Sequence, residues 1–162
     1  MKKVNITSIT RGALIAGILV ILNYIFAPIS FNVVQFRVSE ILCLLPALFP
    51  EAILGMTLGA FLSNLLIEGV GFFDYVFGTL ATFFCSILIN YLFKKTQNLW
   101  LISIFPVIFT VFITGTYLAF LFQTPLLFSW FYVGIGEVGA VYLLAVPFTY
   151  ALKRVMDKRG WK

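Results

Sequence analysis

The chain has 162 residues, 62% of them apolar, with 11 basic and 6 acidic residues. A membrane-spanning helix uses about 20 largely apolar residues, so this composition indicates a membrane protein and excludes a sizeable water-facing enzyme domain. The net charge of +5 does not indicate nucleic-acid binding, because the basic residues are not gathered into one run or one face.

Several kinds of chemistry lack the residues they need. The chain has no histidine, which removes the commonest metal ligand and neutral-pH base, and two cysteines alone cannot build a zinc site. Both cysteines, Cys43 and Cys85, lie in apolar runs, where we expect buried thiols rather than a disulfide. No G-x-x-x-x-G-K-[ST] loop occurs, so any ATP that energises this protein is hydrolysed by another chain. We therefore expect no catalysis, no metal and no cofactor.

The first uncharged stretch predicts one helix followed by a loop. The helix runs from about Gly12 to Ala27 and ends at Pro28, which lacks a backbone donor. The residues that follow, 29–36, are mostly apolar and uncharged and predict a loop.

Small residues form two interleaved pairs on this first helix. Gly12 pairs with Ala16 and Ala13 with Gly17, each at a spacing of four. Such a groove lets another helix approach closely. The pairs predict a contact with a partner subunit, and tight packing inside one bundle is the alternative interpretation.

The stretch 38–67 is interrupted by prolines at 46 and 50 and by Glu51. We predict two short helices that meet near residues 46–51. The alternative is one broken helix, which would reverse every later span and disrupt the charge pattern.

Three further spans follow. The stretch Tyr75 to Phe93 is one clear span, whereas 96–136 is too long for a single helix and is divided at Gln123-Thr124-Pro125. This division gives spans at Leu99 to Phe122 and at about Ser129 to Leu152. Each of these two contains a proline, which membrane helices tolerate better than soluble ones.

Six helices place both termini on one side of the membrane. All Lys and Arg residues except Arg37 then fall on that side, which the positive-inside rule identifies as the cytoplasmic one. We therefore predict an all-α integral membrane protein, a six-transmembrane-helix bundle with N-in/C-in topology and short second and third helices. We expect residues 1–162 to form a single transmembrane domain.

Glu137 lies about eight residues into the last predicted span. A carboxylate at the centre of a membrane helix costs about 2.5 kcal/mol or more, so it should face the bundle interior or a wet cavity. Gly134 and Trp130 lie one and two turns away on the same helix face. An aromatic plane, a bare notch and a carboxylate suit a flat ligand with adjacent N–H donors. The alternative is glycine-mediated helix packing with a structurally paired Glu.

A second polar group lies toward the outer end. Arg37 and Glu40 have i, i+3 spacing, with Gln35 beside them. They form either a local ion pair or a pin that holds the preceding loop as a lid over an outward cavity. Asp74 and Asn64 lie near the same side and either attract a cationic ligand or are solvated helix ends.

One run resembles a known family. The sequence from Ile29 to Leu42, I-S-F-N-V-V-Q-F-R-V-S-E-I-L, closing with Leu45-Pro46, closely resembles the QueT family. These proteins are queuosine-precursor substrate-binding components of energy-coupling-factor (ECF) transporters. Asp74 followed by G-T-L-A-T at 78–82 resembles that family's entry to the fourth helix, and Gly136-Glu137 its last-helix motif. Asn32-Val33 departs from the glycine-containing turn expected there.

The resemblance implies a six-helix bundle that captures a 7-deazaguanine base from outside a prokaryotic cell. It also implies a transmembrane coupling subunit and two cytoplasmic ATPase subunits. In this interpretation Glu137 accepts N1–H and the exocyclic amine of the base. Asp74 or Glu40 pairs with an aminomethyl cation, and Trp130 stacks on the ring.

Two other functions stay open at the level of sequence. One is the same architecture serving another vitamin-like ligand. The other is a small proton- or cation-coupled dimeric carrier in which one intramembrane Glu alternates between substrate and proton.

Overall fold

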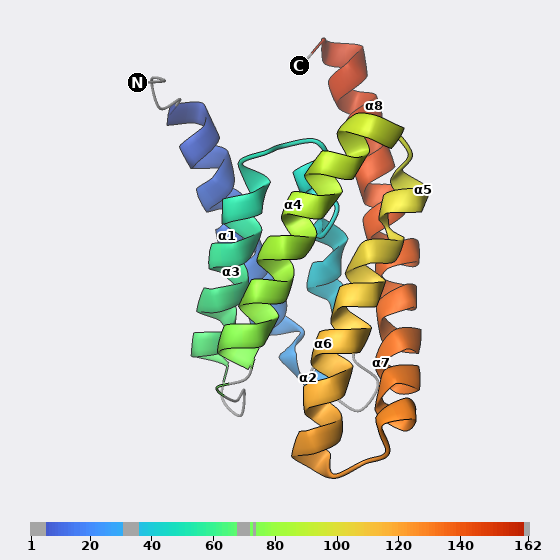
Figure 1. The fold of residues 1–162 in the computed structure, drawn as a ribbon. Coiled ribbons are helices and arrows are strands. Elements are labelled where there is room, and N and C mark those ends of the chain that lie inside the picture. The colour runs from blue at the N-terminus through green and yellow to red at the C-terminus, as the bar shows by residue number, and fades with distance from the viewer. Residues whose placement is uncertain (1–5, 31–35, 68–71, 73, 161–162) are drawn as a thin grey trace.

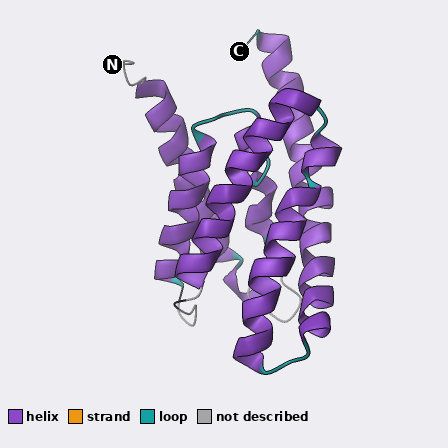
Figure 2. Cartoon of the chain, in the orientation of Figure 1, coloured by secondary structure: helices purple, strands orange, loops and turns teal. Residues whose placement is uncertain are grey.

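The computed structural model describes residues 6–30, 36–67, 72 and 74–160 of the chain (Figure 1). Helices joined by short loops make up this part, which contains no strand (Figure 2). The predicted all-α class is therefore confirmed. In chain order the elements are α1 (Ile6–Ile25), α2 (Ala27–Ser30), η1 (Val38–Leu42), η2 (Leu45–Ala47), α3 (Ala52–Leu66), η3 (Asp74–Gly78), α4 (Thr79–Thr96), α5 (Leu99–Ile102), α6 (Ile104–Phe122), α7 (Leu126–Ala140), η4 (Val141–Ala145) and α8 (Val146–Arg159).

The long helices alternate between two ends of the molecule. We call the end where α1 begins and α8 ends the terminal end, and the opposite one the far end (Figure 1). Helices α1, α3 and α6 run toward the far end, whereas α4 and the continuous α7–η4–α8 return toward the terminal end. The expectation that both chain ends share one side agrees with this arrangement. Which side of a membrane the terminal end faces stays a prediction.

Four helical stretches of the described chain are long and apolar enough to cross a membrane. They are Ile6–Ile25, Tyr75–Thr96, Leu99–Phe122 and Leu126–Arg159, and they correspond to four of the predicted spans. Val38–Ala47 and Ala52–Leu66 are apolar but shorter. The prediction of two short segments here is confirmed, and the count of six membrane-crossing helices stays a prediction.

Several predicted boundaries were wrong. The first helix begins at Ile6 and ends at Ile25, and Pro28 lies inside the short α2 rather than after a longer helix. The second segment is not one short α-helix but the two 3-10 turns η1 and η2, the latter with Pro46 in its first turn. Proline lacks the N–H that an α-helix needs, whereas a short 3-10 turn accommodates it.

The last predicted span was too short at both ends. Pro125 caps α7, so the helix begins at Leu126 rather than Ser129, and it continues to Arg159. A π-helical stretch, η4, joins α7 to α8 just before Pro147. Proline cannot donate to the carbonyl one turn earlier, and a local π adjustment is a usual way to accommodate it.

The break predicted between the last two spans is confirmed. Helix α6 ends at Phe122, and Gln123 takes the left-handed conformation with φ 52°. The Thr124 and Ser129 hydroxyls share a hydrogen bond of 2.7 Å. This turn reverses the chain so that α7 packs beside α6.

Helices α1 and α3 touch backbone to backbone. A Cβ at Gly55 would lie 2.6 Å from the Gly12 carbonyl oxygen, and a Cβ at Gly59 would lie 3.0 Å from the Ala16 carbonyl oxygen. Only glycine fits at such a distance. For Gly12 and Ala16, the structure thus supports the alternative of packing within one bundle.

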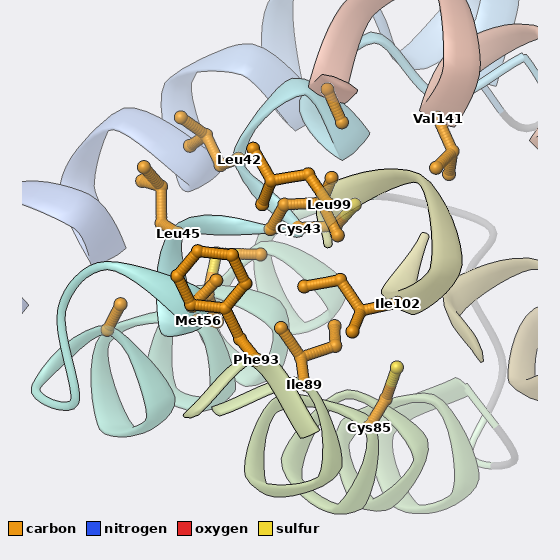
Figure 3. Close-up of a cluster of buried hydrophobic side chains, with 14 of the residues drawn as sticks. Leu42, Cys43, Leu45, Met56, Cys85, Ile89, Phe93, Leu99, Ile102 and Val141 are labelled. Atoms are coloured by element: carbon orange, nitrogen blue, oxygen red, sulfur yellow. The ribbon is translucent and has the colours of Figure 1, made fainter. Parts of the chain in front are cut away.

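The hydrophobic core forms around the two 3-10 turns. Leu42, Cys43 and Leu45 point into a cluster with side chains of α3, α4, α5 and η4 (Figure 3). The Asn90 Nδ2 of α4 donates to the Pro46 carbonyl at 2.6 Å and anchors η2 from the side. Cys43 and Cys85 are buried free thiols, as predicted.

Candidate functional site

A cavity of about 70 Å³ lies at the centre of the bundle. It has room for several water molecules but is smaller than the roughly 300–1,000 Å³ of typical ligand pockets. Its polar lining comes from α1, η1, α3, α4 and α6 and consists of Asn23, Arg37, Ser39, Glu40, Asn64, Thr82, Ser86, Thr110 and Thr114.

Arg37 and Glu40 reach this cavity through the geometry of η1. A 3-10 helix has three residues per turn, so side chains spaced i, i+3 point the same way. Arg37 directly precedes the helix, and both side chains line the cavity. The structure thus brings the predicted Arg37/Glu40 pair to the cavity wall.

Glu137 lies in α7 and is completely buried. Its Oε1 accepts a hydrogen bond from the Thr110 Oγ1 of α6 at 3.2 Å, whereas its Oε2 has no partner among the described residues. Leaving a buried polar group unpaired costs about 1–3 kcal/mol. The expectation that Glu137 faces the bundle interior rather than lipid is confirmed.

The charged residues of the site act on one another. Arg37 and Glu40 both interact electrostatically with Glu137. Thr110 connects the two parts, because it lines the cavity and also donates to Glu137. The arrangement offers carboxylate acceptors and one guanidinium donor to a polar guest.

Trp130 lies against α6. Its Nε1 donates to the Thr116 Oγ1 at 3.1 Å, and its ring meets Phe112 edge-on with centroids 4.9 Å apart. Gly115 leaves the space for this ring, because a Cβ there would lie 2.8 Å from the Trp130 Cδ1. Trp130 and Gly134 line a separate, mostly apolar groove between α6 and α7. The structure therefore does not bring Trp130 into the lining of the central cavity.

Gly139 of α7 packs against the side chain of Phe36, which lies just before η1. A Cβ at Gly139 would lie 3.2 Å from the Phe36 ring. Phe36 therefore docks on α7 one residue before Arg37. This contact fixes the start of η1 near Glu137.

The remaining predicted site residues divide into two groups. Asn64 of α3 lines the cavity, with its Nδ2 3.5 Å from where a Gly78 Cβ would lie. Asp74 begins η3, and its side chain is not described. Gln35 and most of the predicted lid lie outside the described residues. Among the described residues, no group of three or more His, Cys, Asp or Glu side chains could hold a metal ion.

Of the predicted partner-binding residues, two are exposed. Gly12 and Ala16 face α3, as described above. Ala13 and Gly17 are exposed, and nothing lies within 4 Å of a Cβ placed at Gly17.

Several polar residues of the site were missed in the sequence, including Asn23, Ser86, Thr110 and Thr114. Asn23 and Thr110 line the cavity from α1 and α6. An amide inside an otherwise apolar span was an available signal for Asn23, since polar groups at membrane depth usually face the bundle interior. A single threonine such as Thr110 carries no such signal, because its hydroxyl can bond to its own helix.

Comparison with known proteins agrees with the observed features. The family model described as QueT transporter matches residues 9–154. A protein of Lactococcus lactis subsp. cremoris (strain MG1363) named Queuosine precursor transporter QueT is 28% identical over 172 residues, covering 99% of this chain and 96% of the relative. No solved structure matches the chain significantly. The chain is a membrane protein that belongs to the QueT transporter family.

Proposed function

We propose that this protein is the membrane-embedded substrate-binding component of an ECF-type importer in the prokaryotic cell membrane. It captures a 7-deazaguanine queuosine precursor from outside. The observation that carries the proposal is the buried Glu137 beside a polar central cavity, with one carboxylate oxygen unpartnered among the described residues. Family membership and the name of the Lactococcus relative support the class of substrate.

The carboxylate matches one edge of the base. A guanine-like edge presents N1–H and an exocyclic amine side by side, and a carboxylate accepts both as a charge-assisted pair. The Glu137 Oε2 offers free acceptor capacity, and Oε1 retains a second lone pair beside its bond from Thr110. Glu137 is completely buried and does not itself line the cavity, so a base that enters beside Thr110 reaches this carboxylate only when the Thr110 contact opens.

The other charged residues of the site match the remaining polar groups of the substrate. Glu40 lines the cavity and pairs with the aminomethyl cation of the precursor, with Asp74 as the second candidate. Arg37, Asn64 and Gln35 are the proposed donors to ring acceptors. Stacking by Trp130 requires its ring to leave the Thr116 contact.

Transport then depends on other subunits. The chain has no ATP-binding loop, so a transmembrane coupling subunit and two cytoplasmic ATPases supply the energy. Of the small residues on α1, Ala13 and Gly17 are exposed and available to the coupling subunit, whereas Gly12 and Ala16 already contact α3.

Three measurements test this function. Mass spectrometry of the small molecule that co-purifies with detergent-extracted protein should detect a deazaguanine, and competition binding against vitamins should favour the deazaguanine. Uptake by cells should stop when ATP is depleted. Uptake that survives ATP depletion but collapses with an ionophore would contradict the proposal and favour a carrier that uses Glu137 as a proton site.

A further inference from the structure

Asn23 is a buried amide that the proposed substrate contacts above do not use. It lies near the end of α1, is 8% exposed and lines the central cavity. Glu137 and Thr110 belong to α7 and α6, whereas Asn23 belongs to the wall formed by α1 and α3. Asn23 thus places a polar group on the side of the cavity that α1 forms.

The hydrogen bonds of Asn23 determine which amide atom faces which way. Its side-chain amide lies 2.8 Å from the Ser63 Oγ, and the Ser63 Oγ donates to the Ala60 carbonyl at 3.1 Å. A hydroxyl has one proton, so a serine that donates to a carbonyl accepts from the amide. The Asn23 Nδ2 therefore points at Ser63, and the Asn23 Oδ1 points away from it.

The contact between α1 and α3 holds this pair in place. Gly59, one turn before Ser63, brings the backbones together, because a Cβ there would lie 3.1 Å from the Ala16 Cα and 2.8 Å from the Leu19 Cδ2. Ser63 itself is 1% exposed. Both side chains are buried beside this close helix contact, and the hydrogen bond to Ser63 orients the Asn23 amide.

We propose that the Asn23 Oδ1 is a specificity-determining acceptor that takes a hydrogen bond from an N–H group of the substrate, and that Ser63 is the positioning residue that orients it. This inference rests on the proposed function and adds an acceptor from α1 to its site. A fixed oxygen selects ligands with a donor at this end and rejects those with a carbonyl there, because two acceptors cannot pair. A 7-deazaguanine has donors at both ends, the second being on the five-membered ring or its aminomethyl substituent.

Calorimetric titration with 7-(aminomethyl)-7-deazaguanine tests the acceptor. Asn23→Leu should weaken binding about tenfold to a hundredfold, since a substrate donor is left unpaired in a buried site. Asn23→Asp keeps an oxygen at the same place and should bind at least tenfold more tightly than the N23L protein. Thr57→Val is the matched control, because the Thr57 hydroxyl donates to its own helix at the Ile53 carbonyl, and it should leave affinity unchanged.

The role of Ser63 is tested by combining variants. Ser63→Ala should weaken binding about threefold to tenfold in the native background, because the amide is free to turn over. In the N23D background the same change should have no effect, because both carboxylate oxygens accept. A purely structural role would predict equal weakening in both backgrounds.

The results of these experiments distinguish a failure of the proposed function from a failure of the Asn23 or Ser63 assignment. Absence of deazaguanine binding by the native protein would overturn the proposed function. Measurable native binding together with unchanged affinity in N23L would overturn only the assignment of Asn23. Equal weakening by S63A in both backgrounds would overturn the assignment of Ser63.

Discussion

The two sides of the bundle are built differently. Helices α1 and α3 meet through glycine, alanine and serine, and the buried Asn23 Nδ2 donates to the Ser63 Oγ. Helices α6 and α7 meet through aromatic rings and hold a buried carboxylate with an unpartnered oxygen. The first side is a close-packed frame, whereas the second carries an unsatisfied polar group that a ligand can satisfy. The close contact of α1 and α3 therefore sets the position of Asn23, whereas α6 and α7 hold the carboxylate with the unpartnered oxygen, so each helix pair contributes a polar group to the proposed site.

The largest effect should come from adding a methyl group inside the frame. Gly55→Ala places a Cβ 2.6 Å from the Gly12 carbonyl oxygen, so the two helices must separate. We expect a loss of about 3 kcal/mol in the free energy of unfolding in detergent. Gly17→Ala is the control, because nothing lies within 4 Å of the added atom. Equal stability of the two variants would contradict the close contact.

The next effect should come from the anchor of η2. Asn90→Leu removes the donor to the Pro46 carbonyl and leaves that oxygen buried and unpaired. We expect a loss of about 1–3 kcal/mol in thermal unfolding experiments. Thr96→Val, which alters an exposed hydroxyl bonded to its own helix at Leu92, should change stability by less than about 0.5 kcal/mol. Equal losses of stability in the two variants would show that the Asn90 hydrogen bond does not stabilise the fold more than an exposed one does.

A smaller effect is expected between the aromatic helices. Thr116→Val removes the acceptor for the Trp130 Nε1 at the contact between α6 and α7. The half-buried indole N–H then lacks a partner, and we expect a loss of about 1 kcal/mol in unfolding free energy. Deazaguanine affinity should stay the same, because the Trp130 ring packs against Phe112 and Gly115 of α6 and lines the separate groove between α6 and α7. A marked loss of affinity would instead place Trp130 at the ligand.

The smallest effect is expected at the terminal end. The Arg11 Nη1 and the Glu51 Oε1 lie 3.3 Å apart, and the Arg11 side chain is 43% exposed. Exposed ion pairs contribute about 0–1 kcal/mol, so Arg11→Gln should be close to neutral in unfolding experiments. A double-mutant cycle with Glu51→Gln should give a coupling energy below about 1 kcal/mol. A coupling of several kcal/mol would mean that this pair, and not the helix frame, connects α1 to α3.

The sequence predicted those features that depend on one residue type in a strong context. An uncharged run of membrane length predicts a membrane-spanning helix. A single carboxylate between apolar stretches predicts a side chain that faces the bundle interior, as found for Glu137. The break at Gln123 and the burial of both cysteines followed from the same reasoning. These features need no knowledge of how helices pair.

Features that depend on helix pairing could not be predicted. The helical spacing places Trp130 near the Glu137 face, but its ring turns toward α6 because Gly115 leaves room there. Gly12 and Ala16 looked available to a partner until their contacts with Gly55 and Gly59 were known. The 3-10 form of η2 was missed because Pro46 predicts an interruption but not which helix type replaces it.

The most direct test of the account is the affinity of Glu137→Gln for 7-(aminomethyl)-7-deazaguanine, measured by calorimetry beside Glu51→Gln. The amide keeps the shape of the side chain but replaces one acceptor oxygen by a donor, so the N1–H and amine of the base lose their partner. The account predicts a loss of at least about a hundredfold for E137Q, since hydrogen bonds to charged groups contribute about 1.5–3 kcal/mol each. It predicts native affinity for E51Q, whose carboxylate pairs with Arg11 away from the cavity. Unchanged binding by a folded E137Q protein would contradict the account.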